Sequence, residues 1–128
     1  MKTFNYKIEN EELEEIINFN LFKNQENILI QVFCGQSYSN FKKIVTSLTN
    51  HLPRAYCIGT SSDGEICEDE VSINKTIISI SIFEQSFIKI SFSEDKNSYK
   101  RGVDLADELI TKNTKLLILF TDAINTNG

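Results

Sequence analysis

The segment 58–66 holds the side chains of this chain with the greatest capacity for polar chemistry. It reads Ile58-Gly59-Thr60-Ser61-Ser62-Asp63-Gly64-Glu65-Ile66. Its two glycines allow tight turns that expose backbone N–H groups. The hydroxyl side chains between them donate and accept hydrogen bonds without filling the space that they line. Because the segment follows the short apolar run 55–58, it predicts a polar pocket at the end of a β-strand.

Two further polar segments follow predicted strands. Cys34-Gly35-Gln36-Ser37 comes after the apolar run 28–33, and 121–128, which includes Asp122, comes after the apolar run 115–120. In open α/β sheets, ligands bind outside the carboxyl ends of parallel strands. If the strands 28–33, 55–58 and 115–120 are parallel, the three polar segments meet at one edge of the sheet.

The expected lining of that edge suits a small polar or zwitterionic ligand. Asp63 or Glu65 would pair with an ammonium group, and N–H groups at the start of a helix would bind a carboxylate. Hydroxyl groups would bond to the polar body of the ligand. The candidate ligand-binding residues are Ser37, Thr60, Ser61, Ser62, Asp63, Glu65 and Asp122. The alternative interpretation is that all three segments are only turns and helix caps.

The pattern of apolar residues predicts the elements that position these segments. Helical spacing indicates helices over 10–22, from Ser37 or Ser39 to about His51, and over 98–110. The second helix must end near His51 because Pro53 cannot continue it. Alternation or short apolar runs indicate strands at 28–33, 55–58, 76–84, 88–93 and 115–120.

The order of these elements predicts an α/β fold with a mixed sheet. Strands 28–33 and 55–58 are joined by a helix and should be parallel. Strands 76–84 and 88–93 are joined by the short segment 84–86 and should form an antiparallel hairpin. We therefore expect parallel strands flanked by helices, plus this hairpin. The division expected is a helical lead-in over 1–26 and an α/β body over 27–128.

The last predicted strand, 115–120, is apolar at every position after Lys115, which is typical of a strand that is covered on both faces. Only residues 121–128 follow it. The sequence therefore favours the interpretation that the chain is a truncated part of a larger domain.

Charge and composition limit the partners that we expect. The net charge of −5 and the lack of a concentrated basic face argue against a nucleic-acid partner. No apolar run approaches the ~20 residues that cross a bilayer, and the first residues do not form a signal peptide. The three cysteines show no C-x-x-C spacing, which fits a reducing cytoplasm.

Catalytic and metal-binding interpretations find little support in the residues. Cys34 could be a nucleophile at a strand end, but His51, the one histidine, would lie roughly 20 Å away at the far end of a helix. The five acidic residues between positions 63 and 70 do not follow the residue order of an EF-hand loop. The histidine and the cysteines do not have the ligand spacing of a zinc site. The loop 58–66 matches neither common phosphate-binding motif. We expect no catalysis, metal or cofactor.

Several segments together resemble the N-terminal part of the FIST domain, a sensory signal-transduction module of bacteria and archaea. The distinctive piece is Gly59, the hydroxyl run, and Gly64-Glu65-Ile66; more generic matches are 28–35, a strand and turn, and 116–128, a strand leaving through Asp122 and Asn/Gly residues. The family often has alanine where this chain has Asp63, so an acidic group in the pocket is a local departure.

The resemblance implies a function that the residues alone do not. FIST domains accompany output modules such as diguanylate cyclases, phosphodiesterases, histidine kinases and chemotaxis receptors, and are thought to sense small molecules such as amino acids. Their domain also extends beyond a segment of this length. The implied function is a non-catalytic cytoplasmic ligand sensor that regulates an attached output domain. The alternative is an interaction or scaffold module without a small-molecule ligand, and a homodimer is left open.

Overall fold

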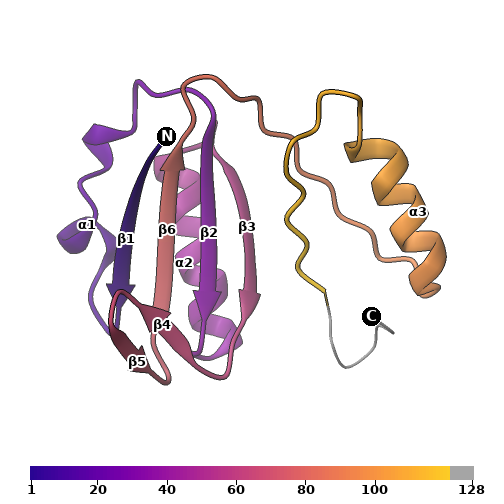
Figure 1. Ribbon diagram of the computed structural model, residues 1–128. Helices are drawn as coiled ribbons and strands as arrows, with labels where there is room; N and C mark the ends of the chain where they lie inside the picture. Colours follow the sequence, from indigo (N-terminus) through magenta and orange to yellow (C-terminus); the bar gives the residue numbers. More distant parts are fainter. Residues whose placement is uncertain (122–128) are drawn as a thin grey trace. The chain divides into compact units, whose positions relative to one another are not determined.

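The computed structural model describes residues 1–121, which fall into two compact units (Figure 1). The first unit, Met1–Ile88, contains a four-stranded sheet, a small hairpin and the helices α1 (Leu13–Ile16) and α2 (Tyr38–His51). The second begins at Lys89 and contains α3 (Ser98–Leu109). None of the helices within residues 1–121 combines the length and apolar character that a membrane crossing requires.

The main sheet is mixed, as predicted. Its strands are β1 (Lys2–Ile8), β2 (Ile28–Cys34), β3 (Tyr56–Ser61) and β6 (Thr76–Ile82), in the order β1-β6-β2-β3. β2 and β3 are parallel, which confirms the expected crossover, and β6 runs antiparallel to both β1 and β2. The carboxyl ends of β1, β2 and β3 therefore lie at the same edge as the start of β6.

Helix α2 (Tyr38–His51) makes the connection between the two parallel strands. Ser37 caps its start, because its side-chain oxygen accepts a hydrogen bond from the Asn40 N–H at 3.3 Å. The helix stops at His51, two residues before Pro53, as the sequence indicated. Figure 1 shows α2 lying along one face of the sheet.

The hydrophobic core lies between that face and the helices. β2 and β6 are central strands, and their alternate residues are buried because they face α2. Ile44 and Leu48 provide the apolar face of α2 that covers them. The members of the core that are fully shielded from solvent are Phe22, Ile30, Val32, Leu48, Ile78 and Ile80.

The predicted helix over 10–22 is wrong. The structure has β1 before it, a single turn of helix, α1 (Leu13–Ile16), and a 3₁₀ turn at Phe19–Leu21. Leu13, Ile17, Phe19 and Phe22 are all buried. At 3.6 residues per turn, one continuous helix would place Phe19 and Phe22 on the side opposite Leu13 and Ile17. Because the helix breaks at Ile17, all four side chains can enter the core.

The predicted strand 55–58 is longer than expected, and the predicted loop after it is shorter. β3 continues through Gly59, Thr60 and Ser61, which pair with the last three residues of β2. Ladder pairing with a central strand outweighs the turn preference of glycine and serine. Glu65 opens a second strand, β4 (Glu65–Cys67), which forms an antiparallel hairpin with β5 (Glu70–Ser72).

The predicted hairpin between 76–84 and 88–93 is also wrong. β6 forms over 76–82, but 88–93 is not a strand. The reason is that both edges of β6 are already paired, one with β1 and the other with β2. The strand β1, which the sequence analysis missed, occupies the position that the predicted hairpin partner would have taken.

In the second unit, α3 confirms the helix predicted over 98–110. Every residue of α3 is at least partly exposed. The strand predicted at 115–120 is not present within the described residues, because this apolar run has no ladder partner there. The sequence analysis expected the end of this strand to be the third one at the site, and no such strand end is observed within the described residues.

Candidate functional site

The candidate site lies at the edge where β2 and β3 end and β6 begins. Cys34, the last residue of β2, is paired with Ser61 on one side and with Thr76 on the other. Two backbone hydrogen bonds extend this pairing: Ser62 N–H donates to Cys34 O at 3.0 Å, and Gly35 N–H donates to Lys75 O at 2.8 Å. The segments after β2 and β3 are therefore held together, as predicted.

Glu65 is the buried acid of this edge, with only 2% of its surface exposed. Its Oε1 accepts a hydrogen bond from the Ser62 hydroxyl at 2.8 Å, and its Oε2 accepts one from the Lys75 N–H at 3.2 Å. The carboxylate thus connects the segment after β3 to the start of β6. A buried acid needs such partners, since an unpaired buried charge is costly.

Gly35 makes room for that carboxylate. A Cβ atom at Gly35 would lie 2.2 Å from Glu65 Oε1, which is much shorter than a van der Waals contact distance. None of the described glycines has a positive φ, so Gly35 is needed for its lack of a side chain and not for an unusual backbone conformation.

A further set of polar contacts at this edge was not predicted. The Thr76 hydroxyl is completely buried and contacts Cys34 Sγ at 3.2 Å and Gln36 Oε1 at 3.3 Å. The Gln36 amide donates to the Glu9 carbonyl, and Lys75 Nζ lies 2.7 Å from Glu9 Oε2. Thr76 shares the alternation of Ile78 and Ile80, which is a sequence signal for a hydroxyl on the buried face.

The other predicted residues lie nearer the surface. Ser37 is exposed at the start of α2, where its hydroxyl also contacts that of Ser39 at 2.9 Å. Ser61 and Asp63 are exposed, and the half-buried Thr60 donates from its hydroxyl to the Ser61 carbonyl at 3.1 Å. Asp122 lies outside the described residues. The structure thus joins Ser62 and Glu65 directly, and Ser37 lies at the end of the segment that follows β2.

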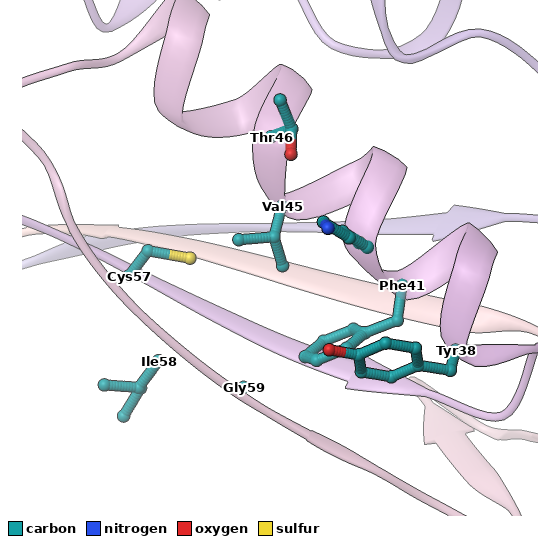
Figure 2. A pocket seen from close by; sticks show the side chains of 8 residues that line it. Tyr38, Phe41, Val45, Thr46, Cys57, Ile58 and Gly59 are labelled. Carbon is teal, nitrogen blue, oxygen red and sulfur yellow. The ribbon is translucent and has the colours of Figure 1, made fainter. Parts of the chain in front are cut away.

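A shallow apolar groove of about 250 Å³ lies between α2 and β3 beside this edge (Figure 2). Its lining residues are Tyr38, Phe41, Lys42, Val45, Thr46, Cys57, Ile58 and Gly59. Burial raises the pKa of the Cys57 thiol to about 11, so this group is a poor nucleophile at neutral pH. The groove contrasts with the polar lining that the sequence analysis expected.

Gly59 was predicted to allow a tight turn, and that prediction is wrong. Gly59 lies within β3, where a Cβ atom would be 3.0 Å from the Val32 carbonyl oxygen and 3.1 Å from the Phe41 ring. Figure 2 shows Phe41 extending from α2 toward Gly59. The glycine therefore permits close packing of the helix on the strand.

We expect Gly59→Ala to lower the free energy of unfolding by about 1–3 kcal/mol, because the added methyl group must displace the Phe41 ring or the β2 backbone. Gly64→Ala is the matched control, since its Cβ would meet Ser72 O at 3.7 Å, an ordinary contact. Urea unfolding followed by circular dichroism measures both. Equal stability of the two variants would show that the packing of Phe41 on Gly59 is not restrictive.

Metal binding and a cysteine–histidine pair find no support at this edge. Within residues 1–121, no three histidine, cysteine or acidic side chains are grouped so that they could hold a metal ion. Cys34 is buried at the end of β2, whereas His51 is the last residue of α2 and stacks on Phe19 with ring centroids 4.2 Å apart. These two residues therefore lie at opposite ends of the crossover unit.

Comparison with known proteins identifies a family. The model of the FIST N domain matches residues 28–128, which include β2, α2, β3 and the 58–66 segment. Among curated proteins and solved structures, none is detectably similar to this chain. β1 and α1 lie before the matched region. Because the match covers most of its length, this chain belongs to the FIST N domain family, whose members are sensory modules of signal transduction.

Proposed function

We propose that this chain is a non-catalytic cytoplasmic sensor of a small polar metabolite, such as an amino acid, and that it regulates an attached output domain. That output domain would be a diguanylate cyclase, a histidine kinase or a chemotaxis module. Family membership supports a sensory role. The observation that supports the place of binding is the meeting of the segments after β2 and β3, with Glu65 buried between them.

The chemistry of the edge fits a zwitterion. Asp63 is exposed and forms no ion pair within the described residues, so its carboxylate is available to an ammonium group. At the start of α2 the Asn40 N–H is bound by Ser37. The N–H groups of Tyr38 and Ser39, which have no partners within the helix, would favour a carboxylate. The hydroxyls of Thr60 and Ser61 are proposed to bond to the polar body of the ligand.

In this proposal Glu65 and Ser62 hold the segment after β3 in place, whereas Asp63 binds the ligand. Their mutual hydrogen bond fixes the segment after β3, and a ligand that competes for the Ser62 hydroxyl would loosen it. Ligand binding would then shift the balance between two arrangements of the 62–75 segment, which is the change that an output domain could detect. Asp122, which lies outside the described residues, stays a predicted ligand-binding residue.

A thermal-shift screen of the full chain against the standard amino acids and small metabolites tests the proposal. A ligand at 100 times its Kd adds ~2.7 kcal/mol to stability and raises the melting temperature. We expect Asp63→Asn to abolish the shift, and Asp69→Asn, which removes an equally exposed acid from the β4–β5 turn, to retain it. If no compound shifts the melting temperature, or if both variants respond like the wild type, the proposed site is wrong.

The alternative function, an interaction module without a small-molecule ligand, is favoured by one observation. The apolar side chains Ile66 and Val71 of the β4–β5 hairpin are exposed. A chain that binds a protein partner through this hairpin but responds to no metabolite would support the alternative.

A further inference from the structure

The β4–β5 hairpin presents its apolar side chains to solvent. Ile66 and Val71 are directly opposite each other in the ladder and are 73% and 78% exposed. Ile73, two residues beyond Val71 and so expected on the same side, is 64% exposed. Isolated exposed apolar residues are ordinary, but three neighbouring β-branched side chains on one strand face are typical of a contact surface.

The opposite face of the hairpin is polar and turned toward the protein. Glu65 is buried there, and Ser72, its ladder partner, has a buried hydroxyl without a hydrogen-bond partner within the described residues. Glu70 forms an ion pair with Lys7 on β1 at 2.5 Å. These contacts fix which face points inward. The hairpin therefore cannot bury its apolar residues by rotating, because rotation would expose the Glu65 hydrogen bonds.

Acidic residues surround the apolar face. Between positions 63 and 74 the chain has five acidic residues and no lysine or arginine: Asp63, Glu65, Glu68, Asp69 and Glu70. Lys7 neutralises Glu70, and Glu65 is buried. The other three are exposed and form no ion pair within residues 1–121. The rim of the hairpin face is therefore negatively charged.

We propose that the outer face of the β4–β5 hairpin docks a protein segment in which apolar side chains alternate with lysine or arginine. The apolar side chains would cover Ile66, Val71 and Ile73, and the basic groups would meet the acidic rim. A second copy of this chain fits less well, because it would place the same acidic rim against this one and each copy has a net charge of −5. This docking does not depend on binding of a metabolite.

Fluorescence anisotropy with three labelled peptides on the full chain tests the proposal. The first alternates lysine with isoleucine, the second glutamate with isoleucine, and the third lysine with serine. We expect only the first to bind well, and less tightly as salt is raised. Equal binding of the first and second peptides would contradict the role of the acidic rim, and absence of binding by the first would overturn the proposal.

Matched variants locate the binding. The double variant Ile66→Thr/Val71→Thr keeps β-branched residues in both strands, so we expect the hairpin to be retained. We expect this variant to weaken binding of the first peptide by about tenfold or more. Leu21→Gln, at another exposed apolar residue, should have no effect. Glu68→Gln/Asp69→Asn should weaken binding several-fold. Glu26→Gln/Glu84→Gln removes equal charge from exposed positions at the opposite edge of the sheet and should not.

Sedimentation across a range of concentrations addresses the competing occupant. We expect the chain to show no self-association through this face. A dimer that the Ile66→Thr/Val71→Thr variant abolishes would assign the face to a second copy and overturn the proposal. Unchanged peptide binding by that variant would overturn it as well.

Discussion

Replacement of Gly35 by alanine is expected to lower the free energy of unfolding by about 2–4 kcal/mol, because the hydrogen bonds of Glu65 to a hydroxyl and to a backbone N–H would be broken. The new Cβ would lie 2.2 Å from Glu65 Oε1 and 2.8 Å from its Cδ. The carboxylate must then leave its place. Urea unfolding followed by circular dichroism measures the loss, with Gly64→Ala as the control.

A double-mutant cycle shows whether Glu65 is the cause. In a Glu65→Ala background there is no carboxylate for the alanine at position 35 to displace. Gly35→Ala should then lower the free energy of unfolding much less than it does in the wild-type background. If Gly35→Ala costs the same in both backgrounds, the contact with Glu65 does not explain the glycine. If Gly35→Ala is as stable as the wild type, the buried position of Glu65 is itself wrong.

Phe22→Ala is expected to have the largest effect of any single substitution considered, about 3–5 kcal/mol. Phe22 is completely buried and packs edge-on against Phe4 of β1, with ring centroids 5.3 Å apart. Removal of the ring leaves a cavity between β1 and the 3₁₀ turn. The neighbouring Leu21 is 52% exposed, so Leu21→Ala is the matched control and should change stability little.

This comparison tests whether residues before the matched family region are part of the fold. β1 pairs with β6 along its whole length, and Phe4, Tyr6 and Ile8 face the core. If Phe22→Ala and Leu21→Ala had similar stability in the same urea titration, the N-terminal segment would contribute little to the core. The region 1–26 would then be only a lead-in to the α/β body, which is the division that the sequence analysis expected.

The parts of the fold that the sequence predicted well are those with long, regular patterns. α2 has helical spacing, a serine cap and a proline just beyond its end, and β2 is apolar except for Gln31. Isoleucine and serine alternate from Ile78 to Ile82 in β6, so its location was predictable. Each of these signals is local, and the structure satisfies it without conflict between neighbouring elements.

The failures depend on contacts between distant parts of the chain. Nothing local in 76–93 indicates that β6 pairs with β1 and β2 rather than with 88–93, since the choice depends on which strand reaches β6. β1 was overlooked, and so was Glu9, which follows it and bonds to Gln36 and Lys75. Glycine was interpreted as a turn residue at Gly59, whereas tertiary packing against Phe41 explains it.

The candidate site was predicted in outline and not in detail. The parallel pairing of β2 and β3 was enough to bring Ser62 toward Cys34 and Gly35. Burial of Glu65, in contrast, could not be predicted, because acidic residues are ordinarily exposed and its partner, the Lys75 N–H, lies ten residues further along, just before β6. The proposed ligand-binding roles of the seven candidate residues remain predictions.

A nuclear magnetic resonance titration of the full chain with pooled amino acids tests the central claim most directly. With backbone amides assigned, we expect saturable shifts at Gly35, Ser37, Ser62 and Gly64, and none at the opposite edge of the same sheet, where Ile28 pairs with Ile82. Pools that shift these amides would then be resolved into single compounds. A spectrum that no pool changes, or shifts confined to other parts of the chain, would contradict ligand sensing at the ends of β2 and β3.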